Sequence, residues 1–355
     1  MANKIDINFW KGKRVFVTGH TGFKGSWFCI FLNLLGAKIT GYALKPKSKP
    51  SLFNLAKVGG LVEKSIISDI RNYNKLYREI KKSKSSILFH LAAQPLVRYS
   101  YLEPKETFDT NISGTLNILE CIRKLKHIKS SIIITTDKVY DISKNKVFKE
   151  SDRLGGMDPY SASKVCCEYL FTSYTSSFFE KKSKQRLATV RAGNVVGGGD
   201  YSEDRLIPDI YVSAKKLKKI ILRNPQSVRP WQHVLEPLSG YLSLAIALSQ
   251  RPELHGEAFN FGPQSQQKHS VLELVQQMAL HWEQVRWQDV SGSVAGPYES
   301  GLLKLNCDKS LHYLQWHAVM GFEDSVRMTA EWYCTYYQKP AQIAPTTNAQ
   351  IAAYT

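Results

Sequence analysis

Short apolar runs alternate with longer segments of helical periodicity over most of the first 190 residues. The first run, residues 14–18, is β-branched and ends at a glycine turn, as a buried strand does. We expect strands at residues 14–18, 37–44, 86–92, 131–136 and 187–191, and helices at 25–35, 111–125 and 161–178. This alternation predicts an α/β fold, in which a doubly wound parallel sheet carries helices on both faces.

The pattern changes after the three glycines at residues 197–199. Six prolines between residues 208 and 263 break the chain into short pieces. We therefore expect residues 1–190 to form the main domain, and residues 191–338 to form mainly a smaller, mixed C-terminal lobe interleaved with the end of the sheet. Residues 339–355 are rich in Ala, Gln, Thr and Pro, and this composition predicts a flexible tail.

The formal net charge of +18 comes entirely from the first 250 residues. They hold 41 Lys and Arg against 20 Asp and Glu, whereas the remainder holds 7 against 10. Such a balance fits nucleic acid, an anionic membrane, a phosphorylated small molecule or simply a lysine-rich solvated surface. Because the lysine runs at 81–84 and 215–219 lack interleaved aromatic residues, the sequence argues against a nucleic-acid partner.

Other features bear on the compartment and on metals. No apolar window approaches the roughly 20 residues of a membrane span, and residues 1–10 lack the apolar core of a secretory signal. Six cysteines are present, but no pair has the CxxC spacing. We expect a cytoplasmic protein with reduced thiols, no membrane partner and no metal site.

A glycine-rich turn follows the first predicted strand directly. Gly19, Gly22 and Gly25 have the spacing G-x-x-G-x-x-G. Glycine lets the backbone approach a pyrophosphate closely, and the following helix presents free N–H groups and the positive end of its dipole. The alternative is a turn that only caps the helix. The place of this turn, between the first strand and the first helix, favours a dinucleotide-binding, Rossmann-type domain.

The choice of dinucleotide stays open at the end of the second strand. A carboxylate that binds the ribose of NAD is usual there, roughly 20 residues after the glycines. This chain has Leu44 and Lys45 instead, and Lys45 could meet the 2′-phosphate of NADP.

A tyrosine and a lysine lie four residues apart on one predicted helix. Tyr160 and Lys164 therefore share a helix face. An ordinary tyrosine is a poor base at neutral pH, and a nearby ammonium favours its phenolate by lowering its pKa. The alternative is an ordinary surface pair, but the glycine turn earlier in the chain favours a catalytic Tyr/Lys pair.

Hydroxyl and carboxyl groups end the strand that precedes this helix. Thr136 and Asp137 follow the apolar run 131–134. Ligands of parallel sheets bind at the carboxyl ends of the strands. Thr136 could thus bridge a substrate alcohol and Tyr160, and Asp137 is a candidate general acid, unless it only caps a turn.

These motifs together resemble the extended short-chain dehydrogenase/reductase family. The resemblance rests on residues 19–25, 91–94 and 111–115, on Thr136, and on the Tyr160/Lys164 pair. Within that family, the segments 19–27, 94–98, 191–200 and 229–237 are most similar to the CDP-glucose 4,6-dehydratases. The similarity extends from about residue 9 to residue 337, and the last two segments are its most specific part.

The resemblance implies tightly held NAD, which the reaction returns unchanged. The residues that the family pattern assigns to the cofactor are Gly19, Thr21, Gly22, Phe23, Lys24, Gly25, Asp69, Ile70, Leu91, Ala92, Ala93, Asn111, Thr135, Tyr160 and Lys164. It also implies a sugar-nucleotide substrate, CDP-glucose. By motif position, its candidate ligands are Gln94, Arg98, Asn194, Arg205 and Arg229.

The implied reaction oxidises the sugar at C4, eliminates water across C5 and C6, and returns the hydride to C6. Tyr160 then takes the proton of the 4-hydroxyl, Thr136 holds the 4-oxygen, and Asp137 protonates the departing 6-hydroxyl. Related dTDP-sugar enzymes carry a glutamate as the C5 base where this chain has Lys138. Lys138 would need a depressed pKa to act as that base, and otherwise it stabilises the enolate.

The nucleobase contacts, the oligomeric state and the alternative functions remain to be stated as expectations. Residues 296–300 match the family only loosely, so contacts to the nucleobase are not assigned. The resemblance implies a homodimer or homotetramer, which associates through helices at 104–125 and 161–179. The alternatives are another sugar-nucleotide dehydratase or 4-epimerase (acting on a GDP-, UDP- or dTDP-sugar) and, more distantly, a non-catalytic dinucleotide-binding protein.

Overall fold

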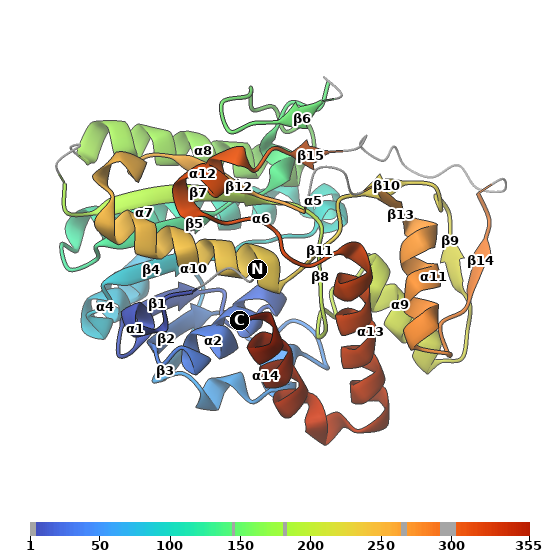
Figure 1. Cartoon of the computed structure of the whole chain (residues 1–355). Helices are drawn as coiled ribbons and strands as arrows, with labels where there is room; N and C mark the ends of the chain where they lie inside the picture. Colours follow the sequence, from blue (N-terminus) through green and yellow to red (C-terminus); the bar gives the residue numbers. More distant parts are fainter. Residues whose placement is uncertain (1–4, 144–145, 180–182, 264–267, 292–302) are drawn as a thin grey trace.

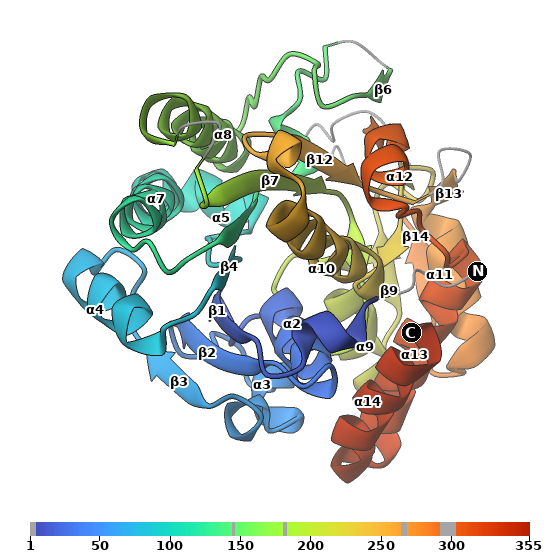
Figure 2. The same ribbon diagram turned by 60° about the vertical axis from the view of Figure 1, so that its left-hand side comes forward.

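A parallel sheet of seven strands forms the centre of the protein (Figures 1 and 2). The computed structural model describes residues 5–143, 146–179, 183–263, 268–291 and 303–355, so the 296–300 segment lies outside the described residues. The strand order is β12-β7-β5-β4-β1-β2-β3, and every pairing within the sheet is parallel. This order reverses direction between β1 and β4, as in a Rossmann-type fold, which confirms the predicted fold class.

The predicted strands and helices are present with small shifts at their ends. The strands are β1 (Arg14–Thr18), β2 (Lys38–Ala43), β3 (Lys64–Ile67), β4 (Ile87–His90), β5 (Ser130–Ile134), β7 (Arg186–Ala192) and β12 (Ala258–Phe261). The helices against them are α2 (Phe23–Leu34), α4 (Tyr73–Ser83), α7 (Gly114–Lys124), α8 (Pro159–Phe178) and α10 (Leu235–Gln250). None of these helices, nor any other in the described residues, is long and apolar enough to cross a membrane.

Alternation along the strands divides the core into two layers. On β1, Val15 and Val17 pack in one cluster with α2 and α10, whereas Phe16 packs in the other with α4, α7 and α8. Successive side chains of a strand point to opposite faces, so a strand that is apolar at every position is buried on both. The uninterrupted apolar runs of the sequence follow from this double burial.

A second lobe follows the sheet and lies to the right in Figure 1. It contains α9 (Leu206–Lys215), α11 (Val271–His281) and α13 (Phe322–Gln338), with the small pairs β9–β14 (Ile220–Leu222 with Trp287–Asp289) and β10–β13 (Val228–Arg229 with His269–Ser270). The chain returns from this region to add α10 and β12 to the main domain. The lobe is therefore interleaved with the sheet.

The C-terminal residues differ from the expected flexible tail. Residues 343–354 form α14 (Ile343–Tyr354), which packs on α13 and beside α2 (Figure 1). Ile343, Thr347, Ile351 and Tyr354 lie on one helix face and are buried. Composition alone hid this spacing, because Ala, Gln and Thr surround the few residues that pack.

A buried ion pair joins α8 to the sheet. Glu168 and Arg191 are 4% and 5% exposed, and the Arg191 Nε lies 2.9 Å from a Glu168 oxygen. The same carboxylate accepts hydrogen bonds from Thr135 at 2.5 Å and from Thr189 at 3.0 Å. Every carboxylate oxygen of Glu168 is therefore bonded, and the helix is fixed against the ends of β5 and β7.

We expect Glu168→Ala to destabilise the fold by about 3–5 kcal/mol, because it leaves the Arg191 charge buried without its partner. Urea unfolding followed by circular dichroism measures this loss. Glu331→Ala is the matched control, since Glu331 pairs with Arg327 at the surface with both side chains more than 40% exposed and should cost less than about 1 kcal/mol. Equal losses in the two variants would contradict the prediction.

Candidate active site

The glycine turn is shaped for close contact with its surroundings. Gly19 has φ +76°, and a Cβ there would lie 2.8 Å from the backbone N of Ala92. A Cβ on Gly25 would lie 2.0 Å from the carbonyl O of Gly19. Neither position can hold a side chain without moving the backbone. Gly22 is the N-cap residue of α2 with no side chain over the helix end, so the N–H groups of that end are open to a pyrophosphate.

The other predicted cofactor residues surround this turn along the carboxyl edge of the sheet. Thr21 donates to the Leu44 carbonyl at 2.8 Å and so joins the turn to the end of β2. Asp69 and Ile70 follow β3, the stretch 91–93 follows β4, and Thr135 follows β5. Asn111 is buried, and its amide bonds the backbone of Gln94. These residues fit a dinucleotide that extends across the sheet edge.

Tyr160, Thr136 and Asp137 come together where β5 ends and α8 begins. The Thr136 hydroxyl donates to Asp137 Oδ1 at 3.1 Å, and it also lies close enough to Tyr160 to lower the pKa of that phenol. All three side chains are buried. Gly193 leaves the space for the carboxylate, because a Cβ there would lie 2.4 Å from Asp137 Oδ2. The structure thus brings together the predicted proton acceptor, hydroxyl and acid.

Burial changes the proton affinity of two of these groups in the same direction. It raises the pKa of Asp137, although Lys138, Thr136 and Lys24 oppose the change. It also raises the pKa of Tyr160 to about 12, opposed by the Thr136 hydrogen bond and the charge of Arg205. A raised pKa suits a carboxyl that must donate a proton near neutral pH.

The charge of Arg205 lowers the pKa of Tyr160. The Lys164 ammonium donates to the Ile134 carbonyl at 3.2 Å, at the end of β5. Its pKa is lowered by burial, an effect that Cys167 and Glu168 partly offset.

Lys24 extends from the glycine turn toward the same groups. Burial and the charges of Arg205 and Lys164 lower the pKa of Lys24 to about 8, while Asp137 and Asp200 act in the opposite sense. Lys138 follows Asp137 on a single 3-10 turn, Asp137–Val139, and is partly exposed. Lys138 therefore lies beside the acid, as its place in the sequence requires.

The predicted substrate ligands divide into two groups. Asn194 and Arg205 lie on the segment 193–205 between β7 and α9, and Arg98 reaches the same segment through a 2.6 Å ion pair with Asp204. Arg229 lies on β10 in the second lobe. Gln94 is 3% exposed and bonds Leu96 and Thr107. These bonds give Gln94 a role in shaping its own loop.

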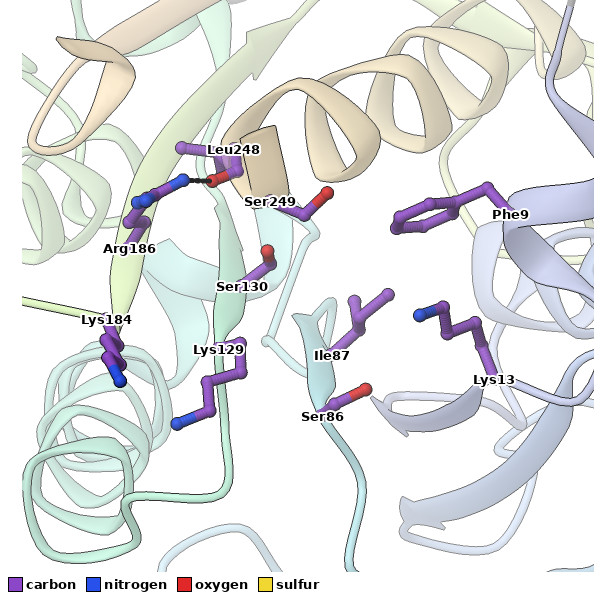
Figure 3. A pocket seen from close by; sticks show the side chains of 10 residues that line it. All are labelled: Phe9, Lys13, Ser86, Ile87, Lys129, Ser130, Lys184, Arg186, Leu248 and Ser249. Atoms are coloured by element: carbon purple, nitrogen blue, oxygen red, sulfur yellow. Dashed lines mark hydrogen bonds between the residues drawn. The ribbon is translucent and has the colours of Figure 1, made fainter. Parts of the chain in front are cut away.

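A cavity of about 420 Å³ lies at the other edge of the sheet, where β4, β5 and β7 begin (Figure 3). Lys13, Lys129, Lys184 and Arg186 line it together with the end of α10. Arg186 donates to the Leu248 carbonyl at 2.9 Å, as a cation at a helix C-terminus does. The helices that connect parallel strands end at this edge, so their last carbonyl groups point toward it. These carbonyls attract cations, which explains why lysine and arginine side chains gather here. The predicted catalytic residues lie at the opposite edge.

Sequence reasoning missed two buried polar residues that support the site. His90 ends β4 and bridges Thr18 at 2.8 Å and Thr115 at 3.2 Å, which connects β1 to α7. Glu168 lies four residues after Lys164 and eight after Tyr160, on the same face of α8. That spacing was visible in the sequence, but its partners Thr189 and Arg191 become apparent only when β7 is placed.

Known proteins share both the sequence and the fold. Residues 16–329 match the family model described as GDP-mannose 4,6 dehydratase. The CDP-glucose 4,6-dehydratase of Salmonella typhimurium is 45% identical over 338 residues, which cover 93% of this chain and 92% of the relative.

Two solved structures share the fold at lower identity. The dTDP-glucose 4,6-dehydratase of Bacillus anthracis in complex with NAD is 23% identical with a TM-score of 0.75, covering 93% of this chain and all of the other. The UDP-glucose-4-epimerase of Stenotrophomonas maltophila with bound NAD is 22% identical with a TM-score of 0.77, covering 91% and 98%. By the match over residues 16–329, the chain belongs to the GDP-mannose 4,6-dehydratase family.

Proposed function

We propose that the protein is an NAD-dependent lyase that dehydrates CDP-glucose to CDP-4-dehydro-6-deoxyglucose. The observation that carries the reaction type is the buried Asp137 carboxyl beside Thr136 and Tyr160. A 4-epimerase needs no acid for a departing 6-hydroxyl, whereas a 4,6-dehydratase does. The relative that is 45% identical over 93% of the chain supports the cytidine nucleotide.

The glycine turn supports NAD as the cofactor. Gly19 and Gly25 leave no room for a Cβ, and the open N-terminus of α2 offers N–H groups to a pyrophosphate. When bound, NAD supplies the hydride acceptor for C4 and the donor for C6. Because the reaction returns the cofactor unchanged, it can stay bound over many turnovers.

Each remaining step belongs to a side chain of the site. Tyr160 accepts the proton of the 4-hydroxyl, and Thr136 holds the oxygen from which it leaves. Asp137 donates a proton to the 6-hydroxyl, which departs as water. Two roles fit Lys138. As a free amine it removes the C5 proton and returns a proton to C5 when the hydride reaches C6; as an ammonium it stabilises the enolate while solvent water takes up and returns that proton.

A panel of sugar nucleotides tests the proposed function. Purified protein is incubated with CDP-, dTDP-, GDP- and UDP-glucose and with GDP-mannose, and products are examined by mass spectrometry. We expect loss of one water from CDP-glucose, with kcat/KM roughly 100-fold above the other substrates. A product of unchanged mass with inverted C4 would establish an epimerase instead, and no product at all would favour a binding protein.

We predict that Asp137→Asn stops the reaction after C4 oxidation. An amide cannot protonate the departing hydroxyl, so elimination fails and no C6 acceptor forms for the hydride. Reduced nicotinamide should then accumulate, with absorbance near 340 nm, while product formation falls by about 100-fold or more. Tyr160→Phe is the control, because it blocks the earlier step and should give no such absorbance. Product formation by Asp137→Asn at the wild-type rate would refute this role.

We propose that the protein associates as a dimer, or a dimer of dimers, through the side that carries α7 and α8. Tyr169 of α8 is 60% exposed although its side chain is large and mainly apolar. An exposed apolar patch is typical of an interface, and Tyr169 would contribute to one. Light scattering should give at least twice the 40.3 kDa chain mass. Tyr169→Glu should lower that mass, whereas Leu217→Glu, at an exposed leucine of the second lobe, should not. A wild-type particle of 40.3 kDa would contradict the proposal.

A further inference from the structure

The segment 193–205 carries two of the predicted ligands of the substrate diphosphate, Asn194 and Arg205. It leaves β7 beside Asp137, passes the three glycines at 197–199, and ends where α9 begins. It has little regular secondary structure beyond the short strand β8 (Val195–Val196), which pairs with β11 (Gln232–His233). The conformation of its second half therefore depends on the elements packed around it.

Two tryptophans from distant parts of the chain hold the middle of this segment. Trp27 of α2 donates through Nε1 to the Gly198 carbonyl at 2.8 Å. Trp332 of α13 covers Gly198 so closely that a Cβ there would lie 2.0 Å from its Cγ. Both indole rings are fully buried. α2 and α13 thus enclose Gly198 from two sides.

The next residue of α13 holds the part of the segment that leads to Arg205. The Tyr333 hydroxyl donates to the Asp200 carbonyl O at 2.5 Å, and the Tyr333 side chain is fully buried. The Asp200 carboxylate is 6% exposed; its Oδ2 accepts from Arg205 at 2.9 Å, and its Oδ1 accepts from the Ser202 backbone N–H at 3.0 Å. A continuous chain of hydrogen bonds runs from α13 to the guanidinium.

The same guanidinium acts on the catalytic centre. Burial lowers the pKa of Arg205, but the Asp200 carboxylate more than offsets this effect and raises it. The charge of Arg205 in turn lowers the pKa of Tyr160. The Arg205 side chain is 36% exposed, and Asp200 accepts the one side-chain hydrogen bond that it donates among the described residues. Its remaining donors are free for a phosphate, which arginine binds through paired N–H groups.

We infer that Asp200 and Tyr333 are positioning residues, which hold Arg205 in place for the substrate diphosphate. The inference rests on the proposed function, because it takes a sugar nucleotide as the ligand. It assigns a task to α13: this helix sets the geometry of substrate binding through the Tyr333 hydroxyl. The alternative is that the hydrogen bonds only stabilise the fold.

Kinetics of four variants separate these two roles. Asp200→Asn keeps the shape and the Oδ1 acceptor but removes the charge that holds Arg205, and Tyr333→Phe removes one hydroxyl. Arg205→Gln removes the guanidinium itself. Tyr337→Phe is the matched control, since it removes a partly exposed hydroxyl from the same helix. Each variant is measured for KM, kcat and the Kd of CDP in the NAD-loaded protein, and for its melting temperature.

We expect a higher KM for CDP-glucose and a higher Kd for CDP, roughly 10-fold in Asp200→Asn and about 3-fold in Tyr333→Phe. The kcat of Asp200→Asn should fall as well, because a displaced Arg205 no longer lowers the pKa of Tyr160. Tyr337→Phe should match the wild type in KM, kcat and Kd. Adding Asp200→Asn to Arg205→Gln should change KM by less than about 2-fold, because the two residues act as one unit. A purely structural role lowers the melting temperature and the active fraction but leaves KM unchanged.

The outcomes also distinguish this inference from the proposed function. If wild-type protein turns over another sugar nucleotide, the proposed substrate is wrong, and the same variants are compared with that diphosphate. If no sugar nucleotide turns over, the Kd of CDP decides the inference by itself. Wild-type Kd values for CDP in both Asp200→Asn and Tyr333→Phe would overturn the inference. It would also be overturned if Asp200→Asn raised the Kd of the Arg205→Gln variant as much as it raises that of the wild type.

Discussion

The geometry of this site depends on the hydrogen bonds and the ion pair of the buried Glu168 carboxylate. It accepts hydrogen bonds from Thr135 after β5 and from Thr189 and Arg191 on β7, while its own helix carries Tyr160 and Lys164. A helix can slide or rotate on an apolar sheet at little cost, whereas a buried carboxylate with fixed partners allows one position. Glu168 lies about two helical turns after Tyr160 on α8, and it is bonded to Thr135, the residue before Thr136. This bond therefore places Tyr160 beside Thr136.

The sequence was sufficient for the framework because the framework follows local rules. Uninterrupted apolar runs, the glycine spacing and the i, i+4 pair gave the sheet, the turn and the catalytic helix without any knowledge of distant contacts. The arrangement of charges could not be predicted in this way. The i, i+4 spacing pointed to Lys164 as a neighbour of Tyr160, but it gave no sign that Arg205, 45 residues after Tyr160, lowers the pKa of the tyrosine.

The C-terminal helix α14 is another feature that depends on distant contacts rather than on local sequence. Residues 339–355 contain few large apolar side chains, so composition indicated a tail. Five buried positions on α14 are nevertheless enough when a partner surface exists, and Tyr354 adds a hydrogen bond to the buried Glu236 at 2.9 Å. Thr347 likewise accepts from the Trp332 indole at 2.9 Å. Tertiary packing decides whether a marginal helix forms, and a single sequence does not display that packing.

Burial acts on the catalytic groups in a way that matches the proton balance of the proposed reaction. It favours the neutral forms of both Asp137 and Tyr160, so Asp137 begins as an acid and Tyr160 must be assisted to accept a proton. In one cycle Tyr160 gains the proton of the 4-hydroxyl, and Asp137 loses one to the departing water. The Thr136 hydroxyl donates to Asp137 and also lowers the pKa of Tyr160. Tyr160, which ends the cycle with an extra proton, and Asp137, which must regain one, therefore lie on either side of one hydroxyl.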